Sequence, residues 1–198
     1  VLFRSDSVTT YLGIIIGAAL VNNVFLVQLL GVSSLFLSSN KLQNALELAL
    51  LNFVVLFLAA SINLAIFRLI LNPLGLEFLR IICFVAVSST LTILILESLK
   101  KKFPLSLRRQ RLAFYLTSGN SAILGVSIIN ADSVLSLTHG VAYNFGAALG
   151  FALMIISFAA LRLRLDTADI PTPFRGAAIQ LISAGIVSMC LLGFAGLV

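Results

Sequence analysis

The residues best able to do chemistry in this sequence are amides that stand inside apolar runs. Asn22 and Asn23 interrupt the first run, and Asn120 interrupts a later one. In hydrocarbon such groups must find partners, and polar stretches are tolerated at membrane depth where protein buries them or where they line a cavity. Two interpretations follow for these amides. Either the helices break near the midplane of the membrane and form a site there, or the amides only stabilise the packing of the helices.

Titratable and metal-binding side chains form no recognisable motif. Cys83 and Cys190 lie far apart in apolar stretches, so they form neither a disulfide framework nor a CxxC pair. His139 has no second ligand at metal spacing. Asp166 and Asp169 are three residues apart, but a general acid and base need a pocket that this stretch does not indicate. The sequence predicts no catalytic or metal site, and no enzyme in this chain alone.

Long apolar runs are the elements that must position the amides. The chain has 198 residues, of which 60% are hydrophobic and 10% charged, against about 25% charged in soluble domains. A helix needs about 20 apolar residues to cross the hydrocarbon. We therefore expect an all-α integral membrane protein with a single membrane domain over 1–198. Charges, prolines and glycines divide it into six predicted spans, at 10–33, 46–71, 78–99, 112–130, 139–162 and 177–197.

The basic residues predict how these spans are oriented. Ten of the thirteen Lys and Arg residues fall in the loops that follow the first, third and fifth spans. The positive-inside rule places those loops in the cytoplasm and both termini outside. Membrane orientation thus explains the net charge of +6, and we expect membrane lipid, and not nucleic acid, as a partner.

Two polar segments, 22–34 and 118–127, occupy corresponding places in the two halves of the chain, 10–99 and 112–197. An odd number of spans separates them, so they enter the membrane from opposite sides, as the inverted repeats of transporters do. We therefore predict two inverted three-helix repeats, with the first and fourth spans broken around 22–33 and 119–121.

Several motifs resemble the RnfA/NqrE family, and RnfA subunits of the Rnf electron-transport complex in particular. The most specific are ADIPTPFRG at 168–176 and GFAGL at 193–197; others are LVNN at 20–23 and Asn120 with the LGV at 124–126. The resemblance runs from about residue 10 to 198. It implies six helices in two inverted repeats, a bacterial inner membrane, external termini and a place in a multisubunit, ion-translocating complex.

The sequence departs from this family where the family's chemistry lies. RnfA-like subunits supply two Cys that, with two from an RnfE-like partner, hold a [2Fe–2S] cluster; the matching positions here are Ser33 and Ser121. Iron in such clusters is held by soft thiolates, for which a hydroxyl is a poor replacement. We expect no such cofactor here. Drift in the neighbouring residues favours natural divergence over an engineered pair.

Asp169 and Arg175 lie in the most family-like loop, and we expect them to pair and to fix that loop against a partner. Two other functions compete with a role in electron transport. One is a non-redox scaffold or accessory subunit that keeps the fold. The other is a small transporter that uses the cavity between the repeats.

Overall fold

The computed structural model describes residues 8–28, 30–31, 42–102, 120–133, 136–168 and 171–193. Every regular element among them is helical, so the predicted all-α class is confirmed. The first half contains α1 (Val8–Ile16), η1 (Gly17–Val21), α2 (Val24–Gln28), α4 (Leu42–Ile66), η2 (Phe67–Leu71), η3 (Glu77–Leu79) and α5 (Arg80–Lys102). The second half contains α7 (Ser121–Asp132), α8 (Leu137–Asp166), η4 (Thr172–Phe174) and α9 (Ala177–Leu192).

Among the described residues, three helical stretches are long and apolar enough to cross a membrane: Ala45–Leu71, Glu77–Ser98 and Leu137–Leu165. Three shorter apolar helices lie at Thr10–Val21, Ser121–Asp132 and Ala178–Leu192. Each of the six overlaps one of the predicted spans, although Thr10–Val21 and Ser121–Asp132 cover only part of theirs. The number of helices that cross the bilayer stays a prediction.

Local signals explain where the long helices begin and end. The turn predicted after the second span is present, because Gly75 adopts φ 66° and its N–H donates to the Asn72 carbonyl. Such a positive φ suits glycine, which has no Cβ to clash with the backbone. At the start of α8, Ser136 is the N-cap, and its hydroxyl accepts a hydrogen bond from the His139 N–H.

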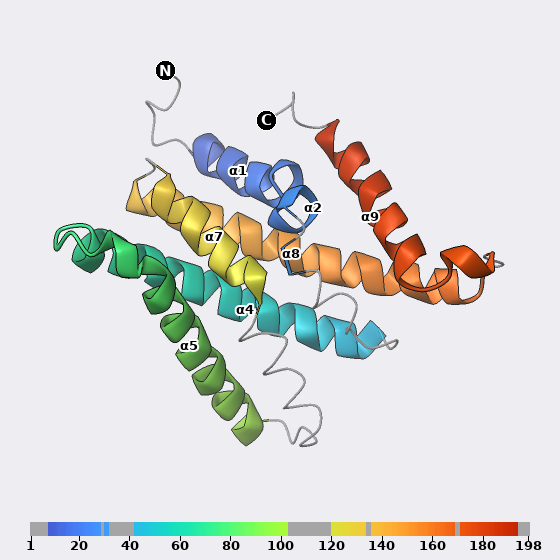
Figure 1. Cartoon of the computed structure of the whole chain (residues 1–198), viewed down its shortest axis with the longest axis horizontal. Helices are drawn as coiled ribbons and strands as arrows, with labels where there is room; N and C mark the ends of the chain where they lie inside the picture. Colours follow the sequence, from blue (N-terminus) through green and yellow to red (C-terminus); the bar gives the residue numbers. More distant parts are fainter. Residues whose placement is uncertain are drawn as a thin grey trace.

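The helices α4 and α8 form the centre of the molecule and lie against each other (Figure 1). On one side of α8, α1 and η1 approach closely because Gly146 and Gly150 lie in the contact. A Cβ on Gly150 would lie 2.4 Å from the carbonyl oxygen of Ala19, and one on Gly146 would lie 2.5 Å from that of Ile15. Small residues thus let these backbones meet, as is common between membrane helices.

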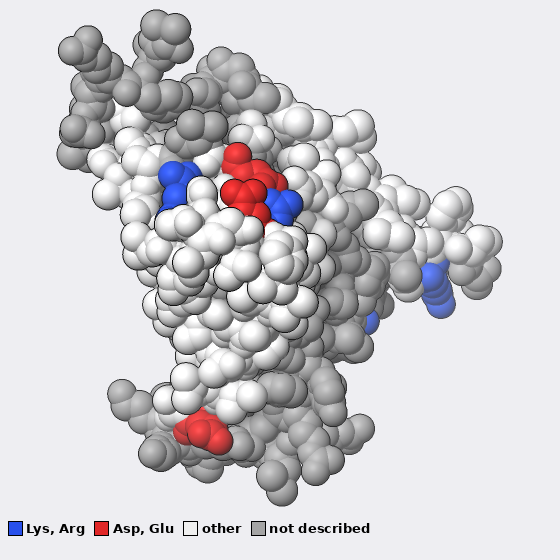
Figure 2. Space-filling model, turned by 60° about the vertical axis from the view of Figure 1, so that its left-hand side comes forward, with Lys and Arg blue, Asp and Glu red and all other residues white. Residues whose placement is uncertain are grey.

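Polar contacts gather several helix ends at one end of the molecule. Arg80 at the start of α5 pairs with Asp132 at the end of α7. Arg68 of η2 donates a 2.8 Å hydrogen bond to the Ser133 carbonyl, and Tyr11 of α1 stacks on His139 of α8. In Figure 2 acidic and basic side chains lie together near one end of the displayed face, with a broad uncharged surface beside them. This pattern suits helices whose ends reach water.

Candidate functional site

The first apolar segment is interrupted where the sequence places Asn22 and Asn23. The Asn22 N–H donates to the Gly17 carbonyl five residues back, which closes the π-helical turn η1. Asn23 is buried, and its Nδ2 donates to the Ala19 carbonyl over 2.7 Å. The side chain of Asn22 is exposed. The expected break is therefore present, and of the two amides only Asn23 faces the interior.

Asn120 opens α7 as its N-cap. Its backbone is extended, and its side-chain oxygen accepts a 3.0 Å hydrogen bond from the Ala122 N–H. Its Nδ2 donates to Oδ1 of Asn52 on α4, also over 3.0 Å. The predicted break of the fourth span, around 119–121, is described only at 120 and 121, because 103–119 lie outside the described residues. Asn120 thus has two roles, since it caps one helix and ties it to another.

The first segment meets the start of α7 at Gly31. The Gly31 N–H donates to the Ser121 hydroxyl oxygen over 2.9 Å, across ninety residues of sequence. Gly31 adopts φ 79°, and a Cβ there would lie 2.8 Å from Oδ1 of Asn120 and 2.6 Å from the Phe151 ring. We call Gly31, Asn52, Asn120 and Ser121 the segment junction. It joins the two polar segments that the sequence singles out.

A second group of polar side chains, all buried except the half-buried Ser61, connects α4, α7 and α8. Nδ2 of Asn63 donates to the Ser127 hydroxyl over 2.9 Å, and Nδ2 of Asn130 donates to Oδ1 of Asn144 over 2.8 Å. Asn144 in turn donates a long hydrogen bond of 3.5 Å to Ser61. We call these five residues the polar cluster.

Sequence reasoning missed the polar cluster and also Asn52 of the segment junction, although a signal for the residues on α4 exists. Asn52 and Asn63 are eleven residues apart in one apolar run, which is three helical turns, so both lie on one face of α4. Ser127 donates its proton to the Ile123 carbonyl, so Asn63 presents its amino group to that hydroxyl. Oδ1 of Asn63 is left buried with no hydrogen-bond partner among the described residues.

The polar side chains of the segment junction are unsuitable as ligands of an iron–sulfur cluster. They are hydroxyl and amide groups, whereas such clusters are held by Cys thiolates. Ser33 lies outside the described residues. Cys83 packs with Phe67 and Phe84 in a separate apolar cluster, and Cys190 is exposed on α9. The described part of the chain contains no group of three or more His, Cys, Asp or Glu side chains that could hold a metal ion.

The remaining predicted pair is only half described. Asp169 lies outside the described residues, so its expected ion pair with Arg175 stays a prediction. Arg175 is exposed and lies between η4 and α9, where it lines a cavity with Arg162 of α8.

Known proteins match this chain along nearly its whole length. The family model described as "Rnf-Nqr subunit, membrane protein" matches residues 11–198. A protein of Alkalilimnicola ehrlichii, named as the A subunit of an ion-translocating oxidoreductase complex, is 42% identical over 187 residues, which are 93% of this chain and 96% of that protein. A protein of the same name from Edwardsiella ictaluri is 39% identical over 190 residues, which are 96% of this chain and 98% of that protein. The chain therefore belongs to the Rnf-Nqr family of membrane-protein subunits.

Proposed function

We propose that this chain is the A subunit of an ion-translocating oxidoreductase complex and sits in a bacterial inner membrane. The observation that carries this proposal is the similarity to relatives of that name over more than nine-tenths of both chains. The apolar helices suit a multi-pass subunit. Its partners are membrane lipid and other membrane subunits, among them an RnfE-like protein.

The proposed orientation puts both termini outside the cytoplasm. The stacking of Tyr11 on His139 brings the start of α1 to the start of α8, and the ion pair of Arg80 with Asp132 brings the start of α5 to the end of α7. These are the helix ends with few basic residues in the sequence. The loops 100–111 and 162–176 then face the cytoplasm, in keeping with the positive-inside rule.

We further propose that Ser33 and Ser121 hold no [2Fe–2S] cluster. Ser121 already accepts the Gly31 N–H, so its hydroxyl has a structural partner. Both positions that resemble cluster ligands offer hydroxyls in place of thiolates.

Co-purification tests the assignment to this complex. The tagged chain is extracted from its native host in a mild detergent, and the eluted proteins are identified by mass spectrometry. We expect the other subunits of an ion-translocating oxidoreductase complex, in constant ratio to the chain. Elution of the chain alone, under conditions in which those subunits remain associated with one another, would overturn the assignment.

Iron analysis tests the cluster proposal separately. Iron and acid-labile sulfide are measured per complex for the native chain and for Ser33→Ala/Ser121→Ala. Equal values, with unchanged assembly, are expected because neither hydroxyl binds iron. A loss of iron in the variant, or a reduced-cluster signal in electron paramagnetic resonance that disappears with it, would refute the proposal and leave the assignment to the complex intact.

A further inference from the structure

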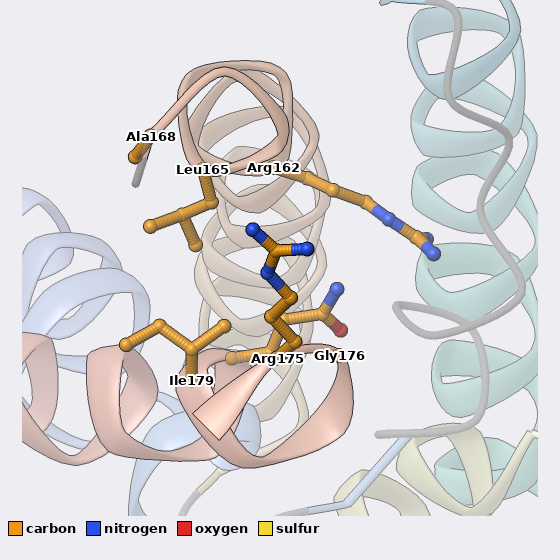
Figure 3. A pocket seen from close by; sticks show the side chains of 7 residues that line it. Arg162, Leu165, Ala168, Arg175, Gly176 and Ile179 are labelled. Atoms are coloured by element: carbon orange, nitrogen blue, oxygen red, sulfur yellow. The ribbon is translucent and has the colours of Figure 1, made fainter. Parts of the chain in front are cut away.

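A cationic cavity lies where α8 ends and α9 begins. It has a volume of about 250 Å³. Residues from both helices and from the turn between them line it, among them Arg162, Leu165, Arg175, Ile179 and Gln180. Figure 3 shows the Arg175 guanidinium between the last turns of α8 and the start of α9, with Leu165 and Ile179 on one side and the Arg162 side chain on the other. Two cationic groups thus border one cavity with apolar walls.

The backbone adds to the positive character of this cavity. Gly176 is the N-cap of α9, with φ 88°, and as a glycine it has no side chain that could cap the first turn of that helix. The first N–H groups of a helix lack intrahelical partners and carry the positive end of its dipole. Gly176 itself lines the cavity, so this helix start adds to the charge of the two Arg side chains. Gln180 adds an amide that can donate a hydrogen bond.

The level of the cavity relative to the membrane indicates which anion it can bind. Leu165 is the last residue of a stretch that can span the membrane, and the apolar part of α9 begins at Ala178. The cavity therefore lies at the level of lipid headgroups. Basic pockets between membrane helices at this level bind lipid phosphates, and Arg matches a phosphate with two parallel hydrogen bonds.

We propose that this cavity binds the phosphate of an anionic phospholipid, with Arg175 and Arg162 on the phosphate and an acyl chain along Leu165 and Ile179. Each of these Arg side chains also has another interaction within the protein. A guanidinium has five N–H donors, so it can serve a phosphate as well. This site is separate from the segment junction and does not depend on the proposed function.

Lipid binding to the full-length chain in detergent tests the proposal. The probes are phosphatidylglycerol, a diacylglycerol with the same acyl chains, and inorganic phosphate, and adducts are measured by native mass spectrometry. Arg175→Gln and Arg162→Gln remove the proposed ligands. Arg164→Gln is the matched control, because Arg164 is exposed on the same helix and does not line the cavity. Far-UV circular dichroism checks that each variant is folded.

We expect phosphatidylglycerol to bind to the native chain and to Arg164→Gln with equal affinity, and to Arg175→Gln about tenfold more weakly, as expected for one lost bidentate contact. Diacylglycerol should not compete. Inorganic phosphate that binds with the same dependence on Arg175 would also support a phosphate site and would point to a soluble phosphate as its ligand. Equal binding of phosphatidylglycerol to all four proteins, or equal binding of diacylglycerol, would overturn the proposal.

Discussion

Replacing Gly31 by alanine should destabilise the protein more than the same change at Gly75. Both glycines have positive φ, 79° and 66°, and a Cβ in that region costs about 1–2 kcal/mol. Only Gly31 is enclosed: its Cβ would lie 2.6 Å from the buried Phe151 ring, whereas nothing lies within 4 Å of a Cβ on Gly75. Overpacking of this kind costs a further ~1–3 kcal/mol. We therefore expect a loss of about 2–5 kcal/mol for Gly31→Ala and about 1–2 kcal/mol for Gly75→Ala.

The free energy of unfolding can be compared by titrating the purified chain from a mild detergent into dodecyl sulfate and following helicity by circular dichroism. A second variant identifies the clash. Phe151→Leu makes room beside residue 31, so Gly31→Ala/Phe151→Leu should lose about 1 kcal/mol less than the sum of the single changes. Equal losses for Gly31→Ala and Gly75→Ala, with strict additivity at Phe151, would refute the close packing at the segment junction.

Three further outcomes are expected. A double-mutant cycle of Asn52→Ala and Asn120→Ala, measured by the same titration, should give a coupling of about 0.6–1.7 kcal/mol, as for other hydrogen bonds between membrane helices; zero coupling would mean that the amides do not interact. Arg80→Gln should change the unfolding free energy by at most about 1 kcal/mol, because its ion pair is exposed; a larger loss would contradict that exposure. In a background without native cysteines, an impermeant maleimide added to intact cells should label Ser136→Cys and not Ser106→Cys; the reverse pattern would invert the topology.

The helical elements could be predicted from the sequence because their limits have local causes. The predicted span 46–71 ends with η2 at Leu71, where the Asn-Pro-Leu-Gly turn begins. The predicted span 139–162 is α8, which begins two residues earlier because Ser136 caps it. The break at Asn22 and Asn23 is predictable as well, since adjacent amides in an apolar run favour an interrupted helix. Turn signals, caps and apolar length are all properties of neighbouring residues.

The contacts between elements could not be predicted in the same way. The hydrogen bond from Gly31 to Ser121 joins residues ninety positions apart, and it exists only because α4 and α8 hold both segments in place. The sequence marks Asn120 as polar within an apolar run, but its partner Asn52 is one of several amides in such runs. The π-helical turns at η1 and η2 could not be predicted either, since their sequences, GAALV and FRLIL, share no pattern.

The chemical kind of the buried polar groups has a consequence for a protein that separates two compartments. Among the described residues, the buried polar side chains belong only to Asn, Ser and Thr. Moving one elementary charge across a membrane potential is worth about 2.3 kcal/mol per 100 mV, but an uncharged amide or hydroxyl carries no such energy. These groups also do not titrate in the physiological range. The helix contacts made by the segment junction and the polar cluster should therefore keep the same geometry and strength whether the membrane is energised or not, and whatever the pH on either side.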